Sequence, residues 1–137
     1  MAKDAADRYF ASFVVDTDAS EVLPETTPEV GIDLGSSHFA VLSDGTRVAS
    51  PRFLRRAERK LKKAQRALSR KTKGSKNRAK ARRKVARAHV RVADARKDFH
   101  HQLSTRVIRE NQAVYVEDLC VKGLGHTRLA KSVHDAG

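Results

Sequence analysis

The 137-residue sequence contains one cysteine, Cys120, and no tryptophan, and aromatic residues make up only 5% of it. A single cysteine excludes an internal disulfide and is typical of a reducing compartment. The first 15 residues lack the basic start and the long apolar core of a secretory signal, and no apolar run approaches the length of a membrane span. We therefore expect a cytoplasmic protein of one domain at most, with no membrane as its partner.

Acidic residues are absent from one long stretch of the chain, because no Asp or Glu occurs between Arg59 and Arg91. Residues 51–110 contain 23 basic and four acidic residues, whereas residues 1–50 contain three basic and nine acidic ones. A solvent-exposed helix face usually mixes Glu with Lys for mutual support. A stretch of one sign instead indicates a polyanionic partner, and nucleic acid is the partner that we expect.

Residues 51–110 are predicted to form an antiparallel helical hairpin. Ser50 and Pro51 are typical of a helix start, and apolar residues at spacings of three and four follow from Leu54 to Leu68. Gly74 and Ser75 interrupt this pattern, and a second apolar stripe follows, which predicts helices of roughly 30 Å and 50 Å. The hairpin has few aromatic residues, so contact with phosphates is expected rather than stacking on bases. The basic residues predicted to contact nucleic acid are Arg55, Arg59, Lys62, Lys63, Arg66, Arg70, Lys73, Lys76, Arg78, Arg82, Arg83 and Arg87.

Three short strands are predicted before the hairpin, over residues 30–35, 38–42 and 47–49. Asp44-Gly45 between the last two is a strong signal for a tight turn, so the three strands are expected to run antiparallel. A fourth strand is predicted over 113–117, after the hairpin.

The flanking segments carry weaker signals. Residues 8–15 are rich in aromatic and β-branched residues and are interpreted as a strand. Together with the polar stretch at 16–28, they form a segment (1–28) that we interpret as left from a preceding domain, followed by a partial domain over 29–137. Residues 119–125 are expected to be a loop, and the tail from Arg128 could begin a helix but ends before completing one.

Two carboxylates stand out against their surroundings. Asp33 lies within an apolar strand, where an unpaired charge costs free energy, and Glu117 ends the fourth strand. Each has an ordinary explanation, as a solvent-facing acid near a turn or at the start of one. If the two strands are neighbours, however, the acids form a pair suited to a divalent metal ion.

Other cofactor signals are missing from the sequence. The six histidines show no paired metal spacing, and Cys120 with His126 does not make a zinc pattern. No glycine-rich phosphate loop is present, so neither a zinc site nor a small-molecule substrate is expected.

Several motifs together resemble the TnpB (OrfB) family of insertion-sequence transposase proteins. The resemblance covers nearly the whole chain, and the motifs agree in order and spacing. They are Gly31-Ile-Asp-Leu-Gly, Leu42-Ser-Asp-Gly, Lys71-Thr-Lys-Gly-Ser-Lys-Asn-Arg, Arg96-Lys-Asp-Phe-His-His-Gln-Leu-Ser and Val116-Glu-Asp-Leu-Cys-Val-Lys-Gly-Leu.

The resemblance implies an α/β fold, a partial ribonuclease-H-like (RuvC-type) mixed sheet with the basic hairpin inserted between strands three and four. It implies that Asp33 matches the first catalytic acid and Glu117 the second, both binding Mg²⁺. The implied activity is that of an RNA-guided DNA endonuclease encoded by a mobile element. Its partners would be DNA and a guide RNA, and its place in a prokaryotic cell would be the cytoplasm, in association with the nucleoid.

The sequence departs from the family pattern at both ends. The family continues to a four-cysteine zinc ribbon and a third catalytic Asp, and begins with a further guide-binding region, none of which is found in these 137 residues. We therefore expect little or no cleavage by this chain alone. The alternative is a non-catalytic remnant that binds DNA or RNA through the basic hairpin.

Overall fold

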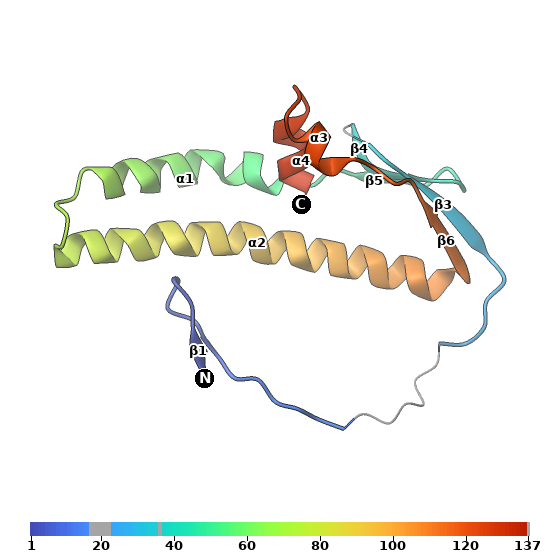
Figure 1. The fold of residues 1–137 in the computed structure, drawn as a ribbon, viewed down its shortest axis with the longest axis horizontal. Helices are drawn as coiled ribbons and strands as arrows, with labels where there is room; N and C mark the ends of the chain where they lie inside the picture. Colours follow the sequence, from blue (N-terminus) through green and yellow to red (C-terminus); the bar gives the residue numbers. More distant parts are fainter. Residues whose placement is uncertain (17–22, 36, 137) are drawn as a thin grey trace. The chain divides into compact units, whose positions relative to one another are not determined.

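The computed structural model describes residues 1–16, 23–35 and 37–136 as a mixed α/β structure (Figure 1). Part of the expected 16–28 linker, residues 17–22, lies outside the described residues, as does Ser36. The chain divides into two compact units, one formed by Met1–Val22 with Leu54–Ala95 and the other by Leu23–Phe53 with Arg96–Gly137. In the ranges described, no helix is both long enough and apolar enough to cross a membrane.

The second unit is built on a four-stranded sheet in the order β5-β4-β3-β6. The expected antiparallel arrangement of the first three strands is confirmed, and the fourth strand pairs with the first in parallel, side by side in Figure 1. The strands are β3 (Glu29–Leu34), β4 (His38–Leu42), β5 (Arg47–Ala49) and β6 (Ala113–Val116).

The turn between β4 and β5 forms as the Asp-Gly pair predicts. Gly45 has a φ of 87°, a conformation in which a residue without Cβ is at no disadvantage. The Asp44 carboxylate accepts a hydrogen bond from the Thr46 backbone N–H at 2.7 Å, which holds its pKa below the usual value. Backbone and side chain therefore fix the same turn.

Helix α2 (Lys76–Glu110) supplies its C-terminal part, from Arg96, to this second unit. Phe99 contacts Phe39 of β4 edge-to-face, with ring centroids 5.1 Å apart, and also contacts Phe53 at 5.9 Å. Such aromatic pairs add stabilisation beyond the apolar area that they bury. The most buried apolar residues of the unit are Val30, Ala40 and Val107.

Two short helices follow β6, where the sequence predicted a loop and an incomplete helix. They are α3 (Val121–Leu124) and α4 (Ala130–Ala136). The Arg96 guanidinium donates to the His134 carbonyl at 2.8 Å, and His100 Nε2 lies 2.8 Å from the Ala136 carbonyl oxygen. The last carbonyls of a helix need partners from outside it, and here α2 provides them. These long-range contacts explain why α4 is complete where the sequence predicted only the beginning of a helix.

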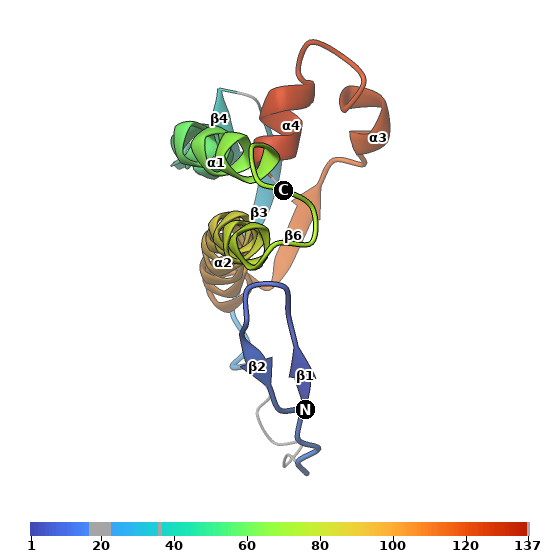
Figure 2. The same ribbon diagram turned by 90° about the vertical axis from the view of Figure 1, so that its left-hand side faces the viewer.

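The first unit contains helix α1 (Phe53–Ser69), from Leu54 onward, and the N-terminal part of α2, which lie side by side as the predicted hairpin (Figures 1 and 2). Leu61 and Val92 are its buried residues on the two helices. The predicted helix start at Ser50-Pro51 is wrong, because Arg52 has a φ of 49° and separates Pro51 from the helix. A left-handed residue cannot continue a right-handed helix.

The turn between the two helices is fixed by Ser75 and Arg78. Ser75 Oγ accepts a hydrogen bond from the Arg78 backbone N–H at 3.1 Å, an N-cap contact for α2. The Arg78 guanidinium reaches back and donates to the carbonyls of Leu68 at 3.3 Å and Lys71 at 2.9 Å. One half-buried side chain therefore joins the start of α2 to the end of α1.

The N-terminus forms a small β-hairpin of β1 (Ala2–Lys3) and β2 (Tyr9–Phe10), visible in Figure 2. The strand predicted over residues 8–15 is thus wrong in extent, since only two of its residues are in a strand, and their partner lies within the chain. Alternation of apolar residues predicts a strand only where a neighbouring edge is available.

This hairpin is attached to α2 by polar contacts. Arg83 donates to the Asp7 carboxylate at 2.8 Å, Arg87 donates to the Ala6 carbonyl at 3.1 Å, and Arg8 pairs with Asp94 at 2.7 Å. Hydrogen bonds from Arg83 and then from Lys3 lower the pKa of Asp7 to about 2. Ala6, beside these contacts, is only 3% exposed.

Arg78→Met is expected to lower the free energy of unfolding by about 1–2 kcal/mol, because two helix-end carbonyls lose a charged donor. Urea denaturation followed by circular dichroism measures the change. Arg82→Met is the matched control, since the side chain of Arg82 is exposed and has no hydrogen bond or ion pair among the described residues. Equal effects of the two substitutions would contradict the capping role of Arg78.

Arg83→Gln is expected to raise the pKa of Asp7 from about 2 toward its ordinary value of 3.8. Because the pKa is lowered in the folded state, the Asp7 contacts stabilise the docked hairpin fully above pH 4, and this stabilisation is lost as the pH falls through about 2. An NMR titration of the Asp7 carboxyl carbon measures both effects. Arg82→Gln should leave the titration unchanged, and an Asp7 pKa that is the same in both variants would refute the Arg83 contact.

Candidate functional site

The register of β3 and β6 determines where the two candidate carboxylates lie. The pairs run from Glu29 with Ala113 to Ile32 with Val116, so Asp33 and Glu117 are the next residues along the two parallel strands. Neighbouring strands are about 4.8 Å apart, and residues in register point to the same face. Continuing this register one residue beyond the end of β6 gives Asp33 and Glu117 neighbouring positions on the same side of the sheet.

A direct contact on the same face supports this assignment. Glu29 and Asp33 are four positions apart in β3 and share a face, and Tyr115 is two positions before Glu117 and shares its face. The Tyr115 hydroxyl donates to the Glu29 carboxylate at 3.2 Å, and this hydrogen bond raises the pKa of Tyr115. The alternating residues of the two strands therefore meet on the face that carries the two acids.

Both candidate carboxylates are exposed, and neither side chain makes a hydrogen bond or an ion pair with any residue that the structure describes. Two adjacent, unengaged carboxylates are a suitable part of the ligand set for Mg²⁺, which binds through one or two carboxylates and keeps several waters. Within the described ranges, no group of three or more His, Cys, Asp or Glu residues could hold a metal ion. The carboxylates of Asp33 and Glu117 would therefore be only part of the ligand set of a metal ion.

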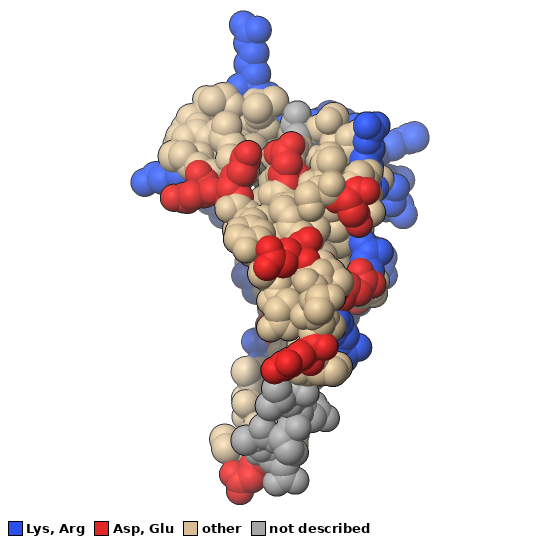
Figure 3. All heavy atoms as spheres, turned by 90° about the vertical axis from the view of Figure 1, so that its right-hand side faces the viewer, with Lys and Arg blue, Asp and Glu red and all other residues tan. Residues whose placement is uncertain are grey.

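Further acidic side chains are exposed on the side of the molecule where the sheet lies. Figure 3 views the molecule from the side on which the sheet lies in Figure 1, and acidic side chains appear at intervals down this face.

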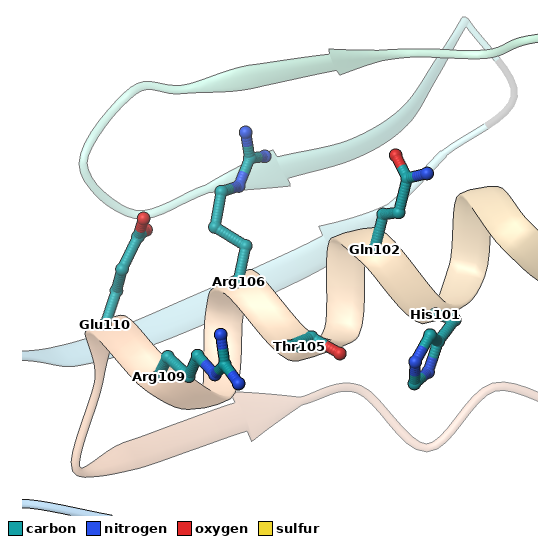
Figure 4. A pocket seen from close by; sticks show the side chains of 6 residues that line it. All are labelled: His101, Gln102, Thr105, Arg106, Arg109 and Glu110. Atoms are coloured by element: carbon teal, nitrogen blue, oxygen red, sulfur yellow. The ribbon is translucent and has the colours of Figure 1, made fainter.

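A shallow hollow of about 440 Å³ lies along the C-terminal half of α2 (Figure 4). All the side chains that line it come from this one helix, and neither candidate carboxylate is among them. The hollow thus does not bring together groups from different elements, as catalytic sites do. Its lining residues are His101, Gln102, Thr105, Arg106, Arg109 and Glu110.

The twelve basic residues predicted to contact nucleic acid all lie in or between α1 and α2, but their side chains have different surroundings. Arg78, Arg83 and Arg87 make the intramolecular contacts described above, and Lys62 pairs with Glu58 at 2.9 Å. Of these contacts, only that of Arg78 has a local signal, because Ser75, three residues before it, has typical N-cap spacing. Seven of the twelve have no such partner among the described residues: Arg59, Lys63, Arg66, Arg70, Lys73, Lys76 and Arg82.

Comparison with known proteins gives two matches. The sequence profile of the family OrfB_IS605, described as "Probable transposase", matches residues 12–128. A protein of Streptomyces pristinaespiralis named "Putative RNA-guided DNA endonuclease" is 48% identical over 137 residues. The match covers 99% of this chain and 34% of that protein, so the chain spans about a third of the length of this relative. On these matches, the chain belongs to the TnpB (OrfB) family of insertion-sequence transposase proteins.

Proposed function

We propose that this chain provides the first two carboxylates and a phosphate-binding helical hairpin of a Mg²⁺-dependent, RNA-guided DNA endonuclease. The single observation that carries the proposal is the parallel pairing of β3 with β6, whose register supports a shared site for Asp33 and Glu117. The strand order and the crossover between these strands are consistent with a ribonuclease-H-like, RuvC-type sheet. The name of the Streptomyces relative supports DNA as substrate and RNA as guide.

In this proposal Asp33 and Glu117 hold Mg²⁺ through carboxylate oxygens. When bound, Mg²⁺ supplies activation of water and stabilisation of charge on the leaving oxygen during phosphodiester hydrolysis. The strands position the two carboxylates before any metal arrives, because their relative placement is set by backbone pairing and not by side-chain contacts. Phosphodiester hydrolysis needs further ligands, so cleavage is assigned to the longer polypeptide of the family and not to these residues alone.

The helical hairpin binds the polyanion. Its cations, without an intervening acid between Arg59 and Arg91, repel one another, and nucleic-acid phosphates relieve this repulsion. Because the contacts are with phosphates, binding is independent of base sequence. A purely binding function is the second candidate, and it is favoured by the lack of a complete metal-ligand group in the ranges that the structure describes.

The metal assignment is tested in a chimera in which this chain replaces the matching third of the Streptomyces relative. Asp33→Asn and Glu117→Gln should each reduce Mg²⁺-dependent DNA cleavage by at least about a hundredfold, since loss of a metal ligand removes several kcal/mol of charge stabilisation. Oligonucleotide binding should not change. Asp118→Asn, next to Glu117 but outside the proposed pair, is the matched control. Full cleavage by either site variant would rule the assignment out.

The binding assignment is tested on the 137-residue chain with labelled oligonucleotides of mixed sequence. Six or more phosphate contacts should make the affinity fall by about 10³-fold or more between roughly 50 and 200 mM salt, because each contact releases counterions. The affinity should be insensitive to divalent metal and to base sequence. A binding constant that is unchanged over this salt range would contradict a phosphate-binding role.

A further inference from the structure

Four cations form a line along α1 and just beyond its end. Arg59, Lys63, Arg66 and Arg70 are spaced by four, three and four residues, which places them within an arc of about 60° on a helix of 3.6 residues per turn. At 1.5 Å per residue the line extends over roughly 16 Å. All four residues are exposed, and none of their side chains has a hydrogen bond or ion pair within the described part of the chain. We call this line the α1 stripe.

The apolar residues of α1 lie on the opposite side of the helix. Leu61, which is 5% exposed, is about 140–180° away from the members of the stripe around the helix axis. The stripe therefore points away from the buried contact of the helical hairpin. No described residue of the first unit makes a side-chain contact with the stripe that a phosphate would have to displace.

Two cations of α2, Arg83 and Arg87, already have intramolecular partners. The Arg83 guanidinium donates to Asp7, which also pairs with Lys3 at 2.9 Å, and Arg87 donates to the carbonyl of Ala6. A phosphate that approaches Arg83 must compete with a carboxylate already at hydrogen-bond distance. Displacing it would also release the buried Ala6 from its site beside α2.

We propose that the basic hairpin has two separate functional faces: the α1 stripe contacts the phosphates of one nucleic-acid strand, while Arg83 and Arg87 hold the N-terminal β-hairpin in place. This inference rests on the proposed nucleic-acid binding and assigns four of its phosphate contacts to named side chains. One strand advances 3.4 Å per nucleotide, so the stripe follows about five nucleotides. The acidic loop at Asp7 occupies the α2 face and prevents phosphates from binding there.

The experiment compares two double variants that remove the same charge from two places. Lys63→Gln with Arg66→Gln removes two members of the stripe, whereas Arg83→Gln with Arg87→Gln removes the two anchors of the N-terminal hairpin. Binding of a labelled single-stranded oligonucleotide of mixed sequence is measured for each variant as a function of salt. Hydrogen exchange of residues 1–10 and circular dichroism report docking and folding.

The stripe variant should lose about 25-fold in affinity at roughly 0.1 M salt, and its log–log salt slope should become shallower by about 1.4, or about 0.7 for each lost contact. Hydrogen exchange at residues 1–10 should not change. The anchor variant should keep the wild-type affinity within about twofold and the wild-type slope, and should exchange faster at residues 1–10.

Asp7→Asn provides an independent test that removes no cation. Asn tolerates the left-handed backbone of Asp7, which has a φ of 69°, so the loop conformation is preserved. Freeing Arg83 should strengthen binding by about fivefold at roughly 0.1 M salt, and Asp7→Asn in the Arg83→Gln background should have no such effect. Equal losses in the two double variants, or no gain from Asp7→Asn, would overturn the division into two faces. Absence of wild-type binding would instead refute the proposed function itself.

Discussion

The parallel pairing of β3 with β6 is the interaction on which the rest of the structure depends. Two parallel strands cannot be joined by a tight turn and require a long crossover, and here residues 50–112 make that crossover, with α1 and α2 as its main parts. The same pairing sets the register of the two acids. A slip by one residue would send Asp33 to one face and Glu117 to the other. Backbone hydrogen bonds, rather than the acids themselves, therefore decide whether the two carboxylates meet.

Cations of the same chemical type have three different uses in this protein. Arg78 satisfies carbonyls at the end of α1, Arg83 holds a carboxylate of the N-terminal hairpin, and Arg66 faces solvent without a partner among the described residues. The net charge counts all three kinds of residue equally. Only residues like Arg66 can bind a ligand without first losing an intramolecular contact. The phosphate-binding surface that we propose for the helical hairpin is therefore smaller than the composition of the hairpin suggests.

The elements that local signals specify were predictable from sequence. Gly45 marks the β4–β5 turn, and the apolar spacing marks α2. The parallel pairing of β3 with β6 has no local signal, and it was expected only from the family resemblance. The start of α1 was not predictable, because Ser50-Pro51 has the composition of a helix start and only the backbone of Arg52 separates it from the helix. The N-terminal hairpin and α4 depend on contacts with α2 that are distant in sequence, such as Asp7 with Arg83 and Arg96 with His134.

The turn that joins α1 to α2 has a consequence for how the chain can vary. Gly74 has a φ of 81°, and a Cβ atom there would meet nothing within 4 Å. No strand pairing involves this turn. Residues can be added or lost at Gly74 without changing the residue count of β3 or β6, so the length of the helical hairpin can drift while the acids stay in register. The same property makes the turn a suitable place for a fluorophore or an affinity tag.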